Sequence, residues 1–354
     1  MTFYNDEFII VVDSLNNIYM FQWKNQCLNL FIFNYITQEV EKIVITEDSL
    51  EEYDVSIDDL DNIYIVYQDT NYNLILIILE DNNLERIELT EKSVPLVKNL
   101  NILNHAKDFH IIYCVEMLNN ANTYEIYHHL YSDENWLTNK VDEIKVLKLL
   151  NPFQIARKDN KIIISYYDYK DKEEIYLKHF NCKERKWEEK IQLTSGGKVK
   201  LYLDLLIIDD KINLVYSEED DGNFVVKYGR FSIERGHINK EIEDTMSNPE
   251  NCSHPTIIYY NNKIWIVWLE YNNVLSRFSE NMGESWSPIY LWNESKKEDI
   301  IKYKYMNIKD KDNRILNSSF GKMYPDISFI GFGPLVNVRE VPLKKKLVIE
   351  PRWF

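Results

Sequence analysis

A short pattern of polar and apolar residues recurs six times along the chain. In each copy a polar turn containing Asn or Asp precedes an apolar residue, a variable one, two mostly apolar ones and an aromatic one. The residues that open the copies are Ile18, Ile63, Phe109, Ile162, Ile212 and Ile264. They are separated by 45, 46, 53, 50 and 52 residues. Self-similarity at a nearly constant spacing indicates a repeat architecture.

Each copy predicts four β-strands. An apolar segment such as 203–208 precedes the opening residue, and a tight turn joins the two as in a hairpin. A third segment such as 224–228 and a fourth such as 238–245 follow. β-Branched and aromatic residues abound, and helical periodicity is scarce. The sequence therefore predicts an all-β fold of four-stranded antiparallel blades arranged radially, which is a β-propeller.

A less regular seventh copy can be read over residues 300–341, with Asp312 and Asn313 in its turn. We favour seven blades. The alternative is six blades, with the residues after 295 closing the ring or forming an appendage. We expect one domain over residues 1–341 and a C-terminal tail over 342–354. The expected blades lie near residues 7–48, 52–92, 99–148, 152–195, 200–246, 253–295 and 300–341.

The charge of the chain argues against a nucleic-acid partner. Its 354 residues include 41 Lys plus Arg and 57 Asp plus Glu, which gives a formal charge of -16. Phosphate binding needs clustered basic residues, and the one compact basic run is Lys344, Lys345 and Lys346. A run of this kind is usually a solvated turn or strand edge. Richness in Asn, Ile, Lys and Tyr indicates an AT-rich genome, such as that of a low-GC bacterium.

The chain is expected to be cytoplasmic, without membrane contact. Its first twenty residues contain Asp6, Glu7 and Asp13 but no basic residue, so they lack the positive region of a signal peptide. No apolar run reaches the roughly 20 residues that span a bilayer. The four cysteines form no C-x-x-C pair, which suits a reducing compartment. His128 and His129 would point to opposite faces of a strand, and we expect neither a metal nor a cofactor.

Residues 279–286 read Ser-Glu-Asn-Met-Gly-Glu-Ser-Trp. The segment resembles the Asp box, S-x-D-x-G-x-[ST]-W, of sialidases and other BNR-repeat propellers, with Asn281 in place of the usual Asp. In those proteins the box lies between the third and fourth strands of a blade, which is where this segment falls. We expect Ser279, Asn281, Gly283 and Trp286 to stabilise this turn, through short polar hydrogen bonds, a positive φ and aromatic packing.

The resemblance implies the fold and not the activity. A sialidase would need three converging arginines, a Tyr-Glu nucleophile pair and a catalytic Asp. In that family one arginine belongs to the first blade, whereas the first arginine here is Arg86. The N-terminal Arg-Ile-Pro signature of the family is also missing. We therefore assign no catalytic residue.

An acidic residue follows each of five opening strands at a nearly constant offset, in the loop between the second and third strands. The five, called the acidic loop residues below, are Asp69, Glu116, Asp168, Glu218 and Glu270. In propellers this loop lies at the mouth of the central funnel, where five carboxylates would attract a cation, an amine or a basic segment. The alternative is that they are solvated loop residues in an acidic chain. The aromatic residues before them are expected to pack between blades: Tyr67, Tyr113, Tyr166, Tyr216 and Trp268.

These observations favour a non-enzymatic monomer that binds a protein or small ligand, basic or cationic, through its acidic funnel face. One alternative is a carbohydrate-active protein of the sialidase-like superfamily, either a glycoside hydrolase or a lectin. Another is a structural component of a surface, spore or phage assembly.

Overall fold

The computed structural model describes residues 8–80, 83–105, 108–118, 120–132, 135–234, 237–297, 299–308, 314–322 and 327–344. Their regular structure consists of β-strands and one 3-10 turn, η1 (Asn293–Lys296). Within these ranges, no helix is both long enough and apolar enough to cross a bilayer.

Strands that follow one another along the chain pair into antiparallel sheets. Three sheets have four strands each. The first contains β5 (Ser49–Ile57), β6 (Ile63–Asp69), β7 (Leu74–Glu80) and β8 (Asn83–Glu88), and the second contains β9 (Val97–His105), β10 (Asp108–Glu116), β11 (Thr123–Ser132) and β12 (Asn135–Lys145). The third contains β18 (Lys200–Ile208), β19 (Lys211–Asp220), β20 (Asn223–Glu234) and β21 (His237–Thr245). A further sheet contains β13 (Phe153–Lys158), β14 (Lys161–Tyr169), β15 (Glu173–Asn181), β16 (Lys186–Trp187) and β17 (Ile191–Gln192). Both β16 and β17 pair with β15 and together take the place of one fourth strand.

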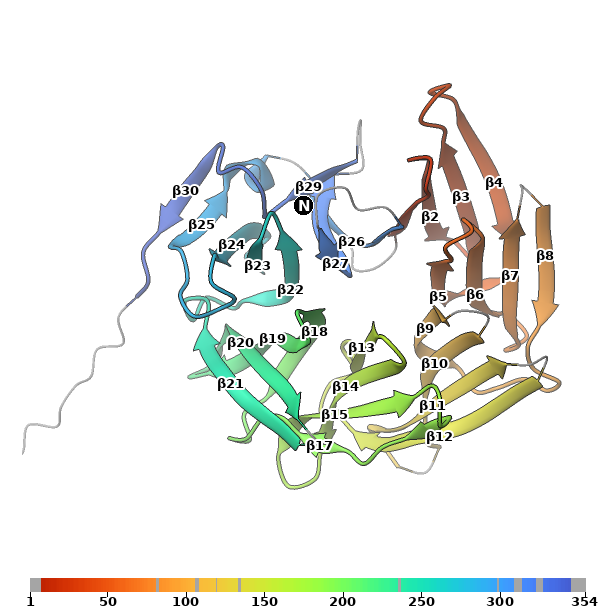
Figure 1. Ribbon diagram of the computed structural model, residues 1–354, viewed down its shortest axis with the longest axis horizontal. Coiled ribbons are helices and arrows are strands. Elements are labelled where there is room, and N and C mark those ends of the chain that lie inside the picture. The colour runs from red at the N-terminus through yellow and green to blue at the C-terminus, as the bar shows by residue number, and fades with distance from the viewer. Residues whose placement is uncertain are drawn as a thin grey trace, which may run out of the picture.

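Two more sheets have the same four-stranded core with added strands. Their cores are β1 (Phe8–Val12), β2 (Ile18–Lys24), β3 (Cys27–Phe33) and β4 (Val40–Thr46), and β22 (Ser253–Tyr260), β23 (Lys263–Glu270), β24 (Asn273–Ser279) and β25 (Ile289–Trp292). Figure 1 shows the sheets arranged around a common centre, with the first strand of each sheet nearest to it. The predicted all-β fold of repeated four-stranded antiparallel sheets is confirmed.

Each of the six opening residues lies in the second strand of its sheet, as the repeat predicts. A hairpin turn joins this strand to the first one, with pairings such as Ile57 opposite Ile63 and Tyr260 opposite Lys263. In the turn before Lys263, Asn261 and Asn262 have φ values of 50° and 57°. Two consecutive positive φ values are typical of the tight turns whose twist matches that of the flanking strands, and Asn tolerates them well.

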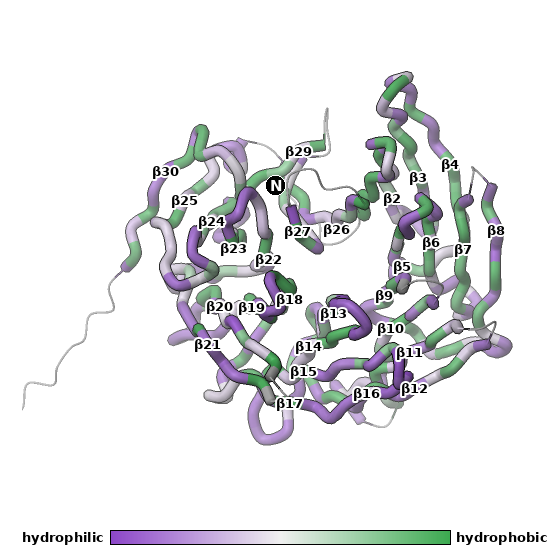
Figure 2. Tube along the Cα trace, viewed as in Figure 1, coloured by the Kyte–Doolittle hydropathy of each residue, from purple (hydrophilic) through white to green (hydrophobic). Residues whose placement is uncertain are grey.

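Hydrophobic side chains pack between neighbouring sheets around the ring. Phe21 and Val55 belong to one buried cluster, and Val215 and Ile266 belong to another. The aromatic residues that were expected to pack between sheets are 0–3% exposed: Tyr67, Tyr113, Tyr166, Tyr216 and Trp268. Figure 2 shows that the outer strands β8, β12 and β21 are mostly hydrophilic, whereas the middle strands β6 and β7 are hydrophobic. Burial from both sides explains why the middle strands read as continuous apolar runs.

The chain after residue 300 departs from the predicted seventh copy. β26 (Ile301–Asn307), β28 (Ser318–Lys322) and β29 (Ser328–Ile330) form a three-stranded antiparallel unit. β26 also pairs in parallel with β1, and Val12 lies opposite Asn307. The segments expected to supply the second and fourth strands instead extend the sixth sheet, because β27 (Ile315–Leu316) pairs with β22 and β30 (Val338–Val341) pairs with β25. Asp312 and Asn313 lie outside the described residues.

Candidate functional site

The five acidic loop residues lie at equivalent places in the structure. Asp69, Glu116 and Glu270 end β6, β10 and β23, and Asp168 and Glu218 lie within two residues of the ends of β14 and β19. All five therefore lie at the ends of second strands, just before the loops in which the sequence was expected to place them. None of the five lines the central cavity described below.

Two acidic loop residues are buried and hold local structure. Asp69 is 2% exposed, and its carboxylate accepts hydrogen bonds from the backbone N of Asn71 (2.9 Å) and of Asn73 (2.7 Å). Asp168 is 5% exposed, accepts a hydrogen bond from the backbone N of Lys145 (3.2 Å) and forms an ion pair with Lys190 (3.0 Å). Both carboxylates therefore have partners within the protein.

The other three acidic loop residues differ in their surroundings. Glu270 accepts a hydrogen bond from Nε1 of Trp268 (2.9 Å), and burial raises its pKa. Glu218 lies 4.0 Å from Nζ of Lys227, and Glu116 is exposed. Four of the five thus have partners inside the molecule, of which Lys190 and Lys227 carry a positive charge. Binding of a basic partner by these residues stays a prediction.

The turn that resembles an Asp box has the expected hydrogen bonds. The Ser279 hydroxyl accepts from the backbone N of Gly283 (2.8 Å) and donates to Oδ1 of Asn281 (2.9 Å). This Oδ1 also accepts from the backbone N of Ser285 (2.9 Å). Gly283 has a φ of +92°, and Trp286 packs edge-on against Tyr228 at 5.0 Å between ring centroids. Asn281 can thus take the place of Asp, because an amide oxygen supplies the same acceptor.

Another repeating position, on the strands nearest the centre, carries polar side chains. The position is defined by its cross-strand partner, which is the third residue after the opening residue of the repeat. In the second sheet the opening residue is Ile63, its third successor is Val66, and Asp54 lies opposite Val66. We call the following residues the polar row: Asp54, Asn101, Gln154, Asp204 and Thr256, together with Lys304 on β26. In β1 the position is occupied by Ile9, which lies opposite Lys304 in the parallel pairing.

The polar row connects neighbouring sheets. Oδ2 of Asp54 accepts a hydrogen bond from the backbone N of Ile102 in the next sheet (2.8 Å). Oδ2 of Asp204 likewise accepts from the backbone N of Ile257 (2.9 Å) and from the hydroxyl of Thr256 (2.7 Å). These acceptors satisfy two backbone donors and one hydroxyl donor of the neighbouring first strands β9 and β22.

Asparagines next to the polar row continue these connections. Nδ2 of Asn99 donates to the carbonyl O of Phe153 (3.0 Å), and Nδ2 of Asn151 donates to that of Leu203 (2.8 Å). Asn99 and Asn151 have φ values of 53° and 55°. Asn adopts this left-handed conformation more readily than most residues, so its side chain can leave the strand and reach the next sheet.

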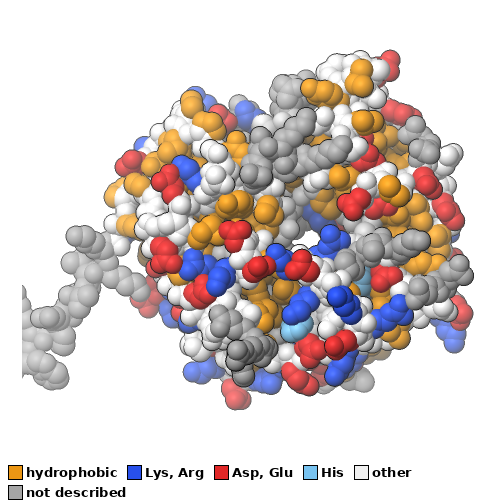
Figure 3. Space-filling view, in the orientation of Figure 1, with side chains coloured by type: hydrophobic (Ala, Val, Ile, Leu, Met, Phe, Trp, Pro, Cys, Tyr) orange, Lys and Arg blue, Asp and Glu red, His pale blue; other side chains and the backbone are white. Residues whose placement is uncertain are grey.

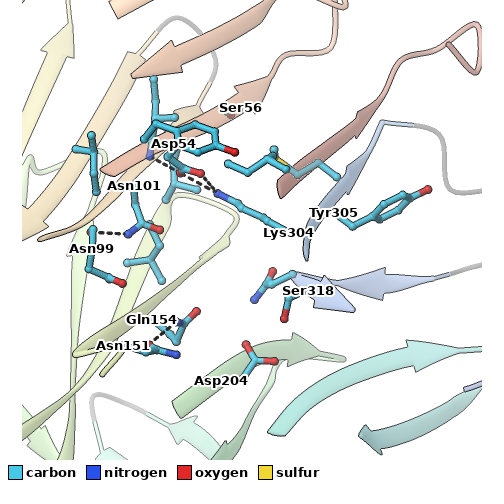
Figure 4. A pocket seen from close by; sticks show the side chains of 18 of the residues that line it. Asp54, Ser56, Asn99, Asn101, Asn151, Gln154, Asp204, Lys304, Tyr305 and Ser318 are labelled. Carbon is cyan, nitrogen blue, oxygen red and sulfur yellow. Dashed lines mark hydrogen bonds and ion pairs between the residues drawn. The ribbon is translucent and has the colours of Figure 1, made fainter. Parts of the chain in front are cut away.

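The first strands surround a central cavity of 870 Å³. Figure 3 shows the hollow near the centre of one face, with basic and acidic side chains around it. In Figure 4, Lys304 extends from β26 toward Asp54, and Gln154 and Asp204 face the same space from other strands. Five of the six polar-row residues line it: Asp54, Asn101, Gln154, Asp204 and Lys304. Tyr202, Tyr305 and Trp23 add aromatic surface.

Two amides in the cavity are held in place and keep an unused acceptor. Nδ2 of Asn101 donates to the carbonyl O of Asn99 (2.8 Å), and Nε2 of Gln154 donates to Oδ1 of Asn151 (2.7 Å). Among the described residues, no donor reaches the amide oxygen of Asn101 or Gln154. Both oxygens can therefore accept hydrogen bonds from a ligand.

Charged groups in the cavity have distinct surroundings. Both oxygens of Asp54 contact Nζ of Lys304, at 2.6 and 2.8 Å, so these two charges compensate each other. Glu52 accepts a hydrogen bond from the backbone N of Leu100 (3.2 Å), and burial raises its pKa. Within the described part of the chain, Arg314 is the one arginine that lines the cavity. The three converging arginines of a sialidase are not found there.

Sequence reasoning missed the polar row, although its signal is visible in the sequence. Five first strands carry a polar residue at the same register, and in β18 it stands alone in an apolar run, Leu201-Tyr-Leu-Asp-Leu-Leu-Ile-Ile208. An isolated polar residue in one strand carries little information. Its recurrence at the same register in five repeats would have indicated a polar lining toward the centre.

Comparisons with known proteins support the fold. No protein-family model and no curated protein sequence matches the chain. Two structures of the polysaccharide lyase PL25 ulvan lyase, one of them bound to -[GlcA(1-4)Rha3S]-, match with a TM-score of 0.59 and 10% identity, and cover 92% of this chain and 94% of the other. The structure of YjhT matches with a TM-score of 0.43 and 9% identity, over 78% of this chain and 96% of the other. At this identity the ulvan lyase likeness concerns the fold alone, and it supports an all-β, propeller-like architecture.

Proposed function

We propose that this protein binds a saccharide in its central cavity. The observation that carries the proposal is the polar row, which places amide, carboxylate and ammonium groups around one central cavity. A saccharide presents many hydroxyl groups, each of which can donate and accept hydrogen bonds, and it is held by several such partners at once.

The size and chemistry of the cavity support this proposal. Ligand pockets commonly have volumes of roughly 300–1,000 Å³ and combine apolar walls with a few oriented polar groups. The cavity here has a volume of 870 Å³ and includes the oriented amides of Asn101 and Gln154 and the rings of Tyr202 and Tyr305. The structural neighbour that binds -[GlcA(1-4)Rha3S]- adds support by analogy of fold.

Calorimetry on the variant that carries both Asn101→Ala and Gln154→Ala tests the proposal. A panel of neutral, uronate-containing and sulfated oligosaccharides first identifies a ligand. Each lost hydrogen bond to that ligand is expected to cost about 1 kcal/mol. The double variant should then bind the ligand roughly thirtyfold more weakly.

The matched control carries Asn83→Ala and Gln192→Ala, which remove the same two side-chain types from exposed positions on β8 and β17. Its affinity should equal that of the unmodified protein. The proposal would be contradicted if the protein binds no saccharide of the panel. It would also be contradicted if the cavity variant binds the ligand as tightly as the unmodified protein does.

Cleavage of the bound saccharide is a second candidate function, favoured by Glu52. A carboxyl group whose pKa is raised by burial retains its proton at a higher pH and can serve as a general acid. If incubation with the ligand yields shorter products, Glu52→Gln should reduce their rate of formation by a factor of about 10² or more. Calorimetric affinity should change little, since Gln keeps the acceptor for the backbone N of Leu100. Undiminished product formation by Glu52→Gln would exclude this role.

We also infer that the ring has seven blades. In this interpretation β26, β28 and β29 form a three-stranded seventh blade, and the first strand of this blade pairs with the first strand of the first blade. The buried cluster that joins Val267 of the sixth sheet to Phe320 of β28 supports it, as does the cluster that joins Ile10 to Tyr303.

A further inference from the structure

Lys302 differs from the other basic residues of the cavity. It lies on β26 two residues before Lys304, and both side chains line the cavity. Lys304 has Asp54 as its partner, whereas Lys302 has no hydrogen bond or ion pair with any described residue. Lys302 is nevertheless only 8% exposed. An ammonium group thus faces the cavity without a counter-ion among the residues that the structure describes.

The neighbouring carboxylates do not supply that counter-ion. Asp54 contacts Lys304 and the backbone N of Ile102. Asp204 accepts hydrogen bonds from the backbone N of Leu205 and of Ile257 and from Thr256. Burying an ammonium group without a partner costs several kcal/mol. A chain with 57 acidic residues and 41 basic ones could readily have placed a carboxylate beside it.

The imidazole of His254 lies close enough to Lys302 to be affected by its charge. Burial, together with the positive charge of Lys302, lowers the pKa of His254 to about 3, so this imidazole is neutral at physiological pH. The ring of His254 lies 4.0 Å from that of Tyr202, which lines the cavity. His254 and Tyr202 have φ values of 52° and 58°.

We propose that Lys302 binds an anionic group, a carboxylate or a sulfate ester, of an acidic saccharide in the central cavity. This inference rests on the proposed saccharide binding and specifies the class of sugar. A single ammonium group interacts more strongly with an anion than with a neutral hydroxyl group, because the hydrogen bond then joins two opposite charges. An acidic sugar unit would therefore be oriented with its charged group toward β26.

The test titrates sodium glucuronate, sodium sulfate and glucose into the full chain at constant ionic strength. The variant is Lys302→Met. The matched control is Lys24→Met, at an exposed position of β2. Methionine retains the length of the side chain, so Lys302→Met should fold with an unchanged or higher melting temperature, because an unpaired buried charge is removed. Affinity for glucuronate and sulfate should fall at least about tenfold in Lys302→Met, a difference of about 1.4 kcal/mol, and stay unchanged in Lys24→Met.

A second readout is the NMR chemical shift of the His254 ring at neutral pH. An anion bound at Lys302 should change this shift in the unmodified protein, and the change should be absent from Lys302→Met. The anion with the higher affinity, glucuronate or sulfate, indicates whether a carboxylate or a sulfate ester is recognised. Equal anion binding by Lys302→Met and the unmodified protein, or no anion binding by either, would overturn the inference.

The saccharide panel separates this inference from the proposed function. Saccharide binding that does not depend on Lys302 overturns the anion site and leaves saccharide binding in place. Binding of small anions through Lys302 without retention of any saccharide supports the anion site and rejects the proposed function.

Discussion

Replacing Asp204 by alanine is expected to lower the free energy of unfolding by about 3–5 kcal/mol, since each buried donor left without a partner costs about 1–3 kcal/mol. The carboxylate is 3% exposed and accepts from the backbone N of Leu205 and Ile257 and from the hydroxyl of Thr256. Two of these donors belong to the next sheet. The substitution should therefore weaken the contact between the fifth and sixth sheets. Urea unfolding followed by tryptophan fluorescence measures the loss.

Two further variants make this measurement specific. Asp204→Asn keeps one acceptor oxygen and should lose less stability than Asp204→Ala. Asp59→Ala removes an exposed carboxylate without a hydrogen bond to any described residue and should stay within about 0.5 kcal/mol of the unmodified protein. A loss below about 1 kcal/mol for Asp204→Ala would contradict the role of the polar row in connecting the sheets.

Acidification is expected to destabilise the fold before most carboxylates titrate, because several histidines are buried in their neutral form. Burial lowers the pKa of His128 well below its ordinary value, lowers that of His129 to about 4 and, with the charge of Lys302, lowers that of His254 to about 3. In the unfolded chain these groups titrate near 6.5. The unfolded state therefore binds protons first, and stability falls as the pH decreases below about 6.5. Each histidine should remove about 2 kcal/mol between pH 7.5 and 5.

The geometry around His128 explains its low pKa. Nε1 of Trp187 donates to Nδ1 of His128 (3.1 Å), and Nε2 of His128 lies 2.9 Å from Nδ1 of His110. The donated bond leaves the proton of His128 on Nε2. A second proton on Nδ1 would face the Trp187 N–H. Phe180 packs edge-on against the His128 ring. Among the described residues, no carboxylate contacts this ring to stabilise a positive charge.

The variant His128→Gln tests this explanation, because it removes one titrating group and retains donors and acceptors. The slope of unfolding free energy against pH between 6 and 5 should become shallower by about 1.4 kcal/mol per pH unit. The raised pKa values of Glu52 and Glu270 act in the opposite direction, since these groups gain protons more readily in the folded state. An unchanged slope in His128→Gln would show that His128 does not contribute to acid sensitivity.

The repeat predicted the sheets well because its signal is local. The turn before Ile264 and the apolar run after it define a hairpin within about ten residues, and its aromatic end, Trp268, is buried as expected. The pairing of residues 300–341 depends instead on contacts that are distant in sequence. The local sequence does not specify which sheet edge a short strand such as β30 pairs with, and in the structure β30 pairs with β25.

The candidate site was harder to predict for a related reason. Asp69 and Asp204 are both acidic residues at repeating positions, yet Asp69 stabilises its own turn whereas Asp204 faces the central cavity. The strand pattern shows that alternate residues share a face. Which face points to the centre, and which carboxylates find donors there, depends on how the sheets assemble around the ring. The partner of Asp54, Lys304, is 250 residues away in the sequence.

A crystal structure of the protein with the best-binding oligosaccharide from the panel is the most direct test of saccharide binding in the central cavity. We expect saccharide density in this cavity, with hydroxyl groups within hydrogen-bond distance of Oδ1 of Asn101 and Oε1 of Gln154. Density at the acidic loop residues or on the outer strands, with an empty cavity, would contradict it.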